Sequence, residues 1–142
     1  MFLSLLRHSA VRPRLSLAIR RLYRSDRQKD RPQARGLRLL RAWLSAEQLA
    51  QFETRGHFDV IGTASGKRYR IHFGVSANVQ EIGEDGSPTT GWCFGPEGGL
   101  VPGDVMLAQK VALETSEYAA LAVANRFPVA TPRRRRGLHR PF

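Results

Sequence analysis

Residues 57–73, HFDVIGTASGKRYRIHF, decide the fold, because their apolar side chains fall on every second position on both sides of a turn. The apolar set is Phe58, Val60, Tyr69, Ile71 and Phe73. Ser65-Gly66 between the two runs is a turn signal. Alternation with a period of two is typical of strands that bury one face, so the segment predicts an antiparallel β-hairpin.

Downstream, the same alternation continues, and the sheet is expected to grow by one or two strands. Val75, Ala77 and Val79 predict a third strand, and Asp85-Gly86 is a second hairpin turn signal. Residues 92–94, Trp-Cys-Phe, predict a short fourth strand. The result is an antiparallel meander of three or four strands. Its expected core face is formed by Phe58, Val60, Tyr69, Ile71, Phe73 and Val79.

Upstream, the period changes to that of a helix. One helical face collects Leu37, Leu40 and Leu44. Ser45 with Gln48 three residues later forms a capping-box pattern, which predicts a second helix that ends near Gly56.

Residues 95–104, GPEGGLVPGD, predict a loop, and Asp104 is a good N-cap for a last helix. The polar arc of that helix is expected to comprise Lys110, Glu114 and Glu117. The opposite side, expected to pack on the sheet, comprises Val105, Ala108, Val111, Ala112, Ala119 and Ala122. Thr115-Ser116 is a candidate break that would give two shorter helices.

The order helix–helix–meander–helix predicts an α+β domain over residues 37–126, between a basic arm and linker at 1–36 and a basic tail at 127–142. Residues 56–126 resemble a group of short uncharacterised bacterial proteins, above all in SGKRYRIHFG and GDVMLAQKVALET. The resemblance covers about half of the chain. It implies a shared small domain and a cytoplasmic origin, and it supplies no catalytic or binding residues.

Charge is distributed unevenly along the 142 residues, whose formal net charge is +11. Residues 1–36 carry ten basic and two acidic side chains, and residues 127–142 carry five arginines and no acid. The middle carries eight basic and ten acidic side chains. Basic ends of this kind attract polyanions through contacts that do not read bases. Both ends are expected to be mobile because they lack the apolar burial that offsets chain entropy.

Two groups of cations are candidate nucleic-acid contacts. Alternate residues of a strand share a face, so Arg68, Arg70 and His72 are expected to line the open side of the sheet. The alternative is a solvated face in which these cations pair with Asp59 or Glu81 on neighbouring strands. The second group is the tail cluster Arg133, Arg134, Arg135 and Arg136, whose alternative role is to keep the chain soluble.

Catalytic signals are weak. Cys93 is the one cysteine, and a nucleophilic role would require His57 or His72 on the same sheet to act as its base. The simpler interpretation is a small buried strand residue. Histidine spacing supports no metal site, and no cofactor is predicted. The leading hypothesis is a small non-enzymatic binding module with polyanion-binding ends, and the rival is a small enzyme that uses His57, His72 and Cys93.

The first 24 residues, MFLSLLRHSAVRPRLSLAIRRLYR, contain no acid and six arginines. Three interpretations stay open for them: a mitochondrial targeting segment that is cleaved, a basic amphipathic arm, or an extension without a role. No apolar run approaches the length of a membrane span. The resemblance to short bacterial proteins implies a cytoplasmic protein, with a mitochondrial location as the alternative if the source is eukaryotic.

Overall fold

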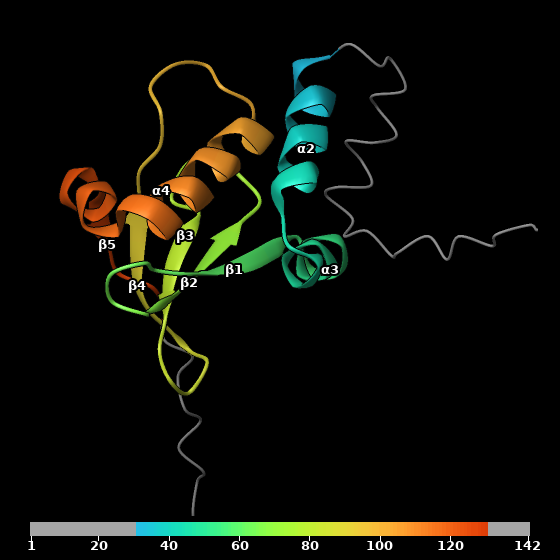
Figure 1. Ribbon diagram of the computed structural model, residues 1–142. Coiled ribbons are helices and arrows are strands. Elements are labelled where there is room, and N and C mark those ends of the chain that lie inside the picture. Colours follow the sequence, from blue (N-terminus) through green and yellow to red (C-terminus); the bar gives the residue numbers. More distant parts are fainter. Residues whose placement is uncertain (1–30, 131–142) are drawn as a thin grey trace, which may run out of the picture.

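The computed structural model describes residues 31–130, which fold as an α+β unit with one antiparallel sheet (Figure 1). The elements follow one another as α2 (Pro32–Trp43), α3 (Ala46–Arg55), β1 (His57–Ile61), β2 (Arg68–His72), β3 (Val79–Ile82), β4 (Pro88–Cys93), α4 (Pro102–Val123) and β5 (Asn125–Phe127). In Figure 1, α4 lies across one face of the sheet and α2 packs against α4, while α3 lies beside β1. None of these helices covers the other face.

The predicted meander is confirmed, with one strand more than expected. The five strands follow the order β1-β2-β3-β4-β5, and every neighbouring pair is antiparallel. Gly66 and Gly86 have φ of +71° and +81° in the two hairpin turns, a region where glycine has no steric cost. β5 was not predicted, because three residues are too few to show a period, and it crosses the expected boundary at residue 127.

The third strand begins later than predicted. Residues 75 and 77 lie in a bent connection, where Ala77 has φ of +49°, and only Val79 of the predicted trio belongs to β3. The side chain of Asn78 accounts for part of this bend, because its amide donates to the backbone oxygens of His72 and Gly74 at 3.0 and 3.4 Å. A side chain that bonds to its own loop competes with strand pairing.

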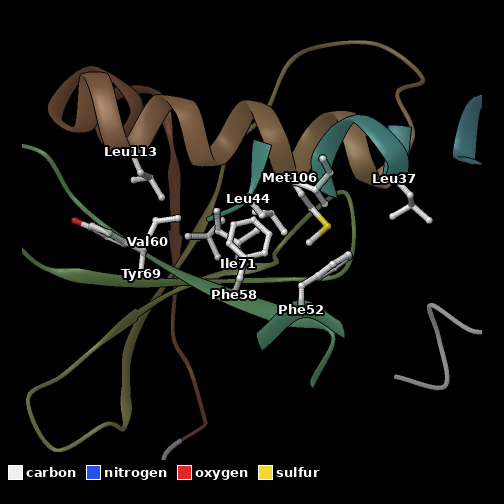
Figure 2. Close-up of a cluster of buried hydrophobic side chains, with 11 residues drawn as sticks. Leu37, Leu44, Phe52, Phe58, Val60, Tyr69, Ile71, Met106 and Leu113 are labelled. Carbon is white, nitrogen blue, oxygen red and sulfur yellow. The ribbon is translucent and has the colours of Figure 1, made fainter. Parts of the chain in front are cut away.

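The core lies between α4 and the upper face of β1–β3 (Figure 2). Phe58, Val60, Tyr69, Ile71 and Val79 are buried as predicted, whereas Phe73 is half-buried at the rim. Figure 2 shows Met106 and Leu113 of α4, Leu37 and Leu44 of the α2 segment and Phe52 of α3 converging on these sheet residues. Burial of apolar area in this cluster is the main stabilising term of the domain.

The structure fixes the bounds of the two helices that precede the sheet. α2 begins at Pro32, so residues 32–36 are the first helical turns and not a linker; Gly36 is buried against Gly103 of α4. The sequence did not predict this contact, because two glycines make it and residues 32–36 contain no large apolar side chain. α3 follows the prediction: Ser45 and Gln48 form the capping box, and Gly56 ends the helix with φ of 75°.

The inward face of α4 was predicted wrongly. Lys110 and Glu117, expected on the solvated arc, are buried, and Glu114 is half-buried. Of the residues expected to face the sheet, Val105 is buried, while Val111, Ala119 and Ala122 are exposed. α4 begins at Pro102 with Val101 at the N-cap, not at Asp104, and the candidate break is present, since Ser116 has non-helical φ and ψ of −147° and 48°.

Candidate functional site

The cations of β2 lie on the open face of the sheet, but two of the three are occupied. Arg70 makes a two-point ion pair with Asp59 on β1, with Nε–Oδ1 at 2.8 Å and Nη2–Oδ2 at 3.1 Å. His72 Nε2 lies 2.9 Å from the side-chain oxygen of Gln80 on β3. The Asp59 hydrogen bond raises the pKa of Arg70, so this pair is stable as an ion pair. The solvated and paired arrangement therefore describes this face.

Arg68 is the exception within the stripe. It is exposed and has no hydrogen-bond or ion-pair partner among the described residues. Together with Ile61 it separates two polar depressions of about 470 and 420 Å³. Acidic side chains line both: Glu81 and Glu84 in the first, Glu47, Asp59 and Glu114 in the second. One free arginine between acidic neighbours is a poor phosphate site.

The tail cluster Arg133, Arg134, Arg135 and Arg136 lies outside the described residues, as do the first 30 residues with their candidate targeting or binding arm. Sequence composition still locates the charge. Residues 31–130 hold ten basic and ten acidic side chains, so the formal charge of the folded unit is zero. Residues 1–30 contribute +6 and residues 131–142 contribute +5.

The three residues of the enzyme hypothesis do not form a catalytic group. His57 and His72 are cross-strand neighbours whose rings meet edge to face, with centroids 5.2 Å apart. Cys93 is on β4, and β3 lies between β4 and β2, so the backbones of His72 and Cys93 are about 10 Å apart at the usual strand spacing. The Cys93 sulfur, on a half-buried side chain, accepts the amide N–H of Ala77 at 3.3 Å.

His57 is the more perturbed member of the histidine pair. Burial lowers its pKa to about 4, and the positive charge of Arg70 and the neighbouring His72 add to this effect. Its Nδ1 is buried and has no hydrogen-bond partner in the described part of the chain. At neutral pH the ring is therefore uncharged, and it packs as an aromatic group at the start of β1.

Within residues 31–130, no group of three or more His, Cys, Asp or Glu side chains is placed to hold a metal ion. None of the helices there has the length and hydropathy needed to cross a membrane.

A buried carboxylate, expected from the sequence to face solvent, accepts four hydrogen bonds in the domain. Glu117 of α4 is 1% exposed and accepts the hydroxyl of Tyr69 at 2.7 Å and the amides of Ala64 and Ser65 at 2.9 Å each. It also accepts the hydroxyl of Ser65. Burial alone would raise the pKa of Glu117, but these hydrogen bonds outweigh it and lower the pKa to about 2.

The turn between β1 and β2 therefore binds an anion, and the anion is the protein's own Glu117. The two turn amides point at the carboxylate, as they would at a phosphate. Gly62 beside them is packed so closely on the carboxylate that a Cβ there would overlap it. The two turn amides are therefore already occupied by the protein's own carboxylate.

The irregular backbone at Ser116 adds a second link between α4 and the loop that Glu117 contacts. In a regular helix the carbonyl of Leu113 would accept the amide of residue 117. Here the amide N–H of Thr63 donates to that carbonyl at 3.1 Å. The break thus joins α4 to the β1–β2 loop through backbone as well as side chain.

A second set of buried hydrogen bonds joins α4 to the other end of the sheet. Asn78 and Gln109 exchange both amide hydrogen bonds, at 2.8 and 2.9 Å, and Gln109 also donates to the carbonyl of Phe94 at 2.8 Å. The sequence did not predict that Gln109 and Glu117 are buried, because polar residues were assumed to face solvent. Both lie on the same helical face as Met106 and Leu113, and this spacing could have indicated that they point inward.

Comparison with known proteins adds no relative: no family model, curated protein or solved structure matches the chain.

Proposed function

We propose that this protein is a small non-enzymatic binding module whose basic ends attach it to nucleic acid or a similar polyanion. One observation carries the proposal: the folded unit, residues 31–130, is formally neutral, so the entire charge of +11 lies in the segments on either side of it. Clustered arginines attract phosphates by releasing counterions, and they do so without sequence readout.

The pairing of charges within the sheet supports this division of roles. A phosphate that approached Arg70 would compete with the carboxylate of Asp59, which already holds the guanidinium at two points. Lys67 is likewise engaged with Glu81 at 3.0 Å. Sheet-based RNA binders stack bases on exposed aromatic rings. Here Tyr69 of β2 is buried on the helix side and bonded to Glu117.

The geometry also favours binding over catalysis. An active site needs titratable groups that converge on a pocket. The groups with the most shifted pKa values do not converge: Glu117 and Tyr69 are buried and bonded to each other, and His57 lies apart from them at the start of β1. Cys93 is separated from both histidines by at least one strand. The polar groups of the domain are used to fix α4 on the sheet.

We further propose that the protein is cytoplasmic. The resemblance of residues 56–126 to short bacterial proteins supports this location. A eukaryotic source would favour the mitochondrial alternative.

The proposal is tested on the full chain with two glutamine variants. One replaces the four arginines at 133, 134, 135 and 136, and the matched control replaces only Arg68 on the sheet. Both are titrated onto a labelled mixed-sequence DNA duplex. We expect the full chain to bind with a dissociation constant in the range of about 1–100 μM, typical of non-specific binding. The tail variant should bind more weakly and with a shallower salt dependence.

The control should behave like the unmodified chain to within one phosphate contact, which is about 0.9 in the slope of log K against log salt. If the Arg68 variant loses most of the affinity while the tail variant keeps it, the sheet is the binding site and the proposal is wrong. If the chain binds anionic vesicles but no duplex, the polyanion is a lipid surface.

A further inference from the structure

One row of exposed side chains runs along the outer side of α2. Residues four apart on a helix lie one above the other. The row with this spacing consists of Arg31, at the N-cap, then Arg35, Leu39 and Trp43. Leu39 is 48% and Trp43 63% exposed. Figure 1 shows α2 at the edge of the folded unit, beside the start of α4. The row is therefore basic where α2 begins and apolar where it ends.

The zero net charge of the folded unit is unevenly distributed. Its ten basic side chains include the four arginines of residues 31–43, a stretch without any acid. Residues 44–130 therefore hold six basic and ten acidic side chains and carry a charge of −4. Residues 1–30, with a charge of +6, join the folded unit at the start of the same helix. Positive charge is thus concentrated around α2.

Three of the four arginines lie on the exposed side of the helix. Arg41 is the exception, because it pairs with the buried carboxylate of Glu53 on α3. The exposed three are Arg31, Arg35 and Arg38. Residues three and four apart are neighbours on a helix surface, so these guanidinium groups form one cluster beside Leu39.

The apolar end of the row borders a groove between α2 and α4. The groove has a volume of about 570 Å³; Leu39 lines it from α2, and Leu107 and Val111 line it from α4. Val111 is 42% exposed. Among the described residues of the lining, only Asp104 is charged. Leu39 thus connects a cluster of arginines to a largely apolar groove.

We infer that this surface docks the folded unit on an anionic lipid surface. The α2 surface, as we name it, consists of Arg31, Arg35, Arg38, Leu39, Trp43 and Val111. A tryptophan and aliphatic side chains next to arginines match the interface of a bilayer, where indole rings lie at headgroup level and apolar side chains enter below them. Arginine extends its charged end to the lipid phosphates while its methylene groups stay on apolar surface.

Charge and apolarity together select this partner. The arginine cluster selects a negatively charged surface, because the single carboxylate of Asp104 in the groove does not balance it. Exposed apolar side chains beside the cluster distinguish lipid from a nucleic-acid duplex, whose phosphates and sugars offer no apolar interior. A second copy of the chain would bring the same arginines face to face.

Single-stranded nucleic acid fits the α2 surface less well than lipid. Proteins that bind single strands stack successive bases on several aromatic rings. The α2 surface instead presents Trp43 together with the aliphatic side chains of Leu39 and Val111. Aliphatic side chains and an apolar groove suit acyl chains and not the flat faces of bases.

The inference does not rest on the proposed function, because it concerns the folded unit and not the affinity of the chain ends for nucleic acid. If both hold, one protein attaches a polyanion to a membrane surface, and the duplex titration and the vesicle experiment can fail separately.

The test is co-sedimentation of the full chain with vesicles of phosphatidylcholine and phosphatidylglycerol in equal amounts, against pure phosphatidylcholine. The first variant combines Leu39→Gln with Trp43→Gln. Its matched control combines Ile61→Gln with Val75→Gln, two apolar positions outside the α2 surface that are 54% and 49% exposed. Circular dichroism melts confirm that each protein folds, and Leu39→Gln alone replaces the first variant if the pair does not.

A second pair of variants tests the charge. Arg35→Gln with Arg38→Gln removes two arginines of the cluster, whereas Arg55→Gln with Arg68→Gln removes two exposed arginines elsewhere. Both variants have the same net charge, so a difference between them reports the position of the charge. Each arginine close to an anionic leaflet contributes about fivefold in affinity.

We expect the unmodified chain to bind the anionic vesicles and to bind pure phosphatidylcholine more weakly. L39Q/W43Q should lose about tenfold or more in vesicle affinity, and its control should lose less than about twofold. R35Q/R38Q should lose roughly 25-fold, and R55Q/R68Q should lose much less. Duplex affinity should be unchanged in L39Q/W43Q, because a duplex does not take up the apolar side chains.

Three results overturn the inference. The first is a full chain that does not bind anionic vesicles. The second is binding that neither α2 variant weakens more than its control, since the chain ends alone would then hold the vesicle. The third is an L39Q/W43Q protein that loses affinity for duplex or single-stranded DNA but not for vesicles, which would make nucleic acid the partner of this surface.

Discussion

The hydroxyl of Tyr69 on β2 donates to the carboxylate of Glu117 on α4 at 2.7 Å, and both side chains are buried. This bond, with the two turn amides that Glu117 also accepts, fixes the C-terminal half of α4 over the first hairpin. The break at Ser116 directly precedes Glu117. Glu117 is therefore a structural residue, although its type and its loop partners are those of an anion site.

Replacing Glu117 should be costly. Glu117→Ala leaves the buried Tyr69 hydroxyl without an acceptor and removes the hydrogen bonds from the amides of Ala64 and Ser65 to a charged group, each worth about 1.5–3 kcal/mol. We expect the free energy of unfolding to fall by about 3 kcal/mol or more, measured by urea denaturation. Tyr69→Phe, which removes one donor, should cost about 1–2 kcal/mol.

Glu97→Ala, at an exposed loop position, is the control and should change stability by less than about 0.5 kcal/mol. If the Glu117 and Glu97 variants lowered the free energy of unfolding equally, the buried hydrogen bonds of Glu117 would not stabilise the fold.

Stability should decrease as the pH falls from 6.5 to about 4, with His57 as one cause. The unfolded chain protonates His57 near its usual pKa of 6.5, but burial and the charge of Arg70 lower the folded pKa to about 4. Between these values the unfolded state binds more protons, so acidification favours unfolding. His57→Gln should flatten the dependence of unfolding free energy on pH in this window.

Glu117 acts in a separate, lower window. Its folded pKa of about 2 is below the ordinary 4.5, so its stabilisation is complete above pH 4.5 and is lost as the pH falls toward 2. An unchanged slope between pH 4 and 6.5 in the His57 variant would contradict the assignment of that window to His57.

The contact between α2 and α4 depends on two glycines. A Cβ at Gly103 would overlap the backbone of Gly36, and neither side has a flexible end that could move away. Gly103→Ala should lower stability by about 1–3 kcal/mol, the usual cost of overpacking. Gly99→Ala, where a Cβ meets open space, should leave the melting temperature close to that of the unmodified chain. A stable Gly103→Ala protein would mean that α2 is loosely attached.

Local pattern was enough to predict the hairpins, the capping box at Ser45 and the core face of β1 and β2. Those features depend on residue spacing within a few positions. The start of α2 and the faces of α4 could not be obtained in this way. Gly36 is buried because of Gly103, and Glu117 is buried because of Tyr69 and Ser65, and each partner is more than 45 residues away. A polar residue faces inward only when distant donors satisfy it, and a single sequence does not show those donors.

The candidate site was likewise predicted only where local pattern determines it. Alternation correctly placed Arg70 and His72 on one open face, but the pairing of Arg70 with Asp59 depended on strand register. The residues of the enzyme hypothesis share a sheet, as expected, and the strand order separates them.

The central claim is that polyanion binding resides in the chain ends and not in the folded unit. Its most direct test compares the full chain with residues 31–130 on the same labelled duplex, at about 50 and 200 mM salt. The account predicts weak binding by the full chain that falls by roughly 10³-fold or more between the two salt concentrations if six or more phosphates are contacted. It predicts no measurable binding by residues 31–130 at either concentration. Equal affinity of the two proteins at low salt would contradict the claim and would identify the open face around Arg68 as the binding surface.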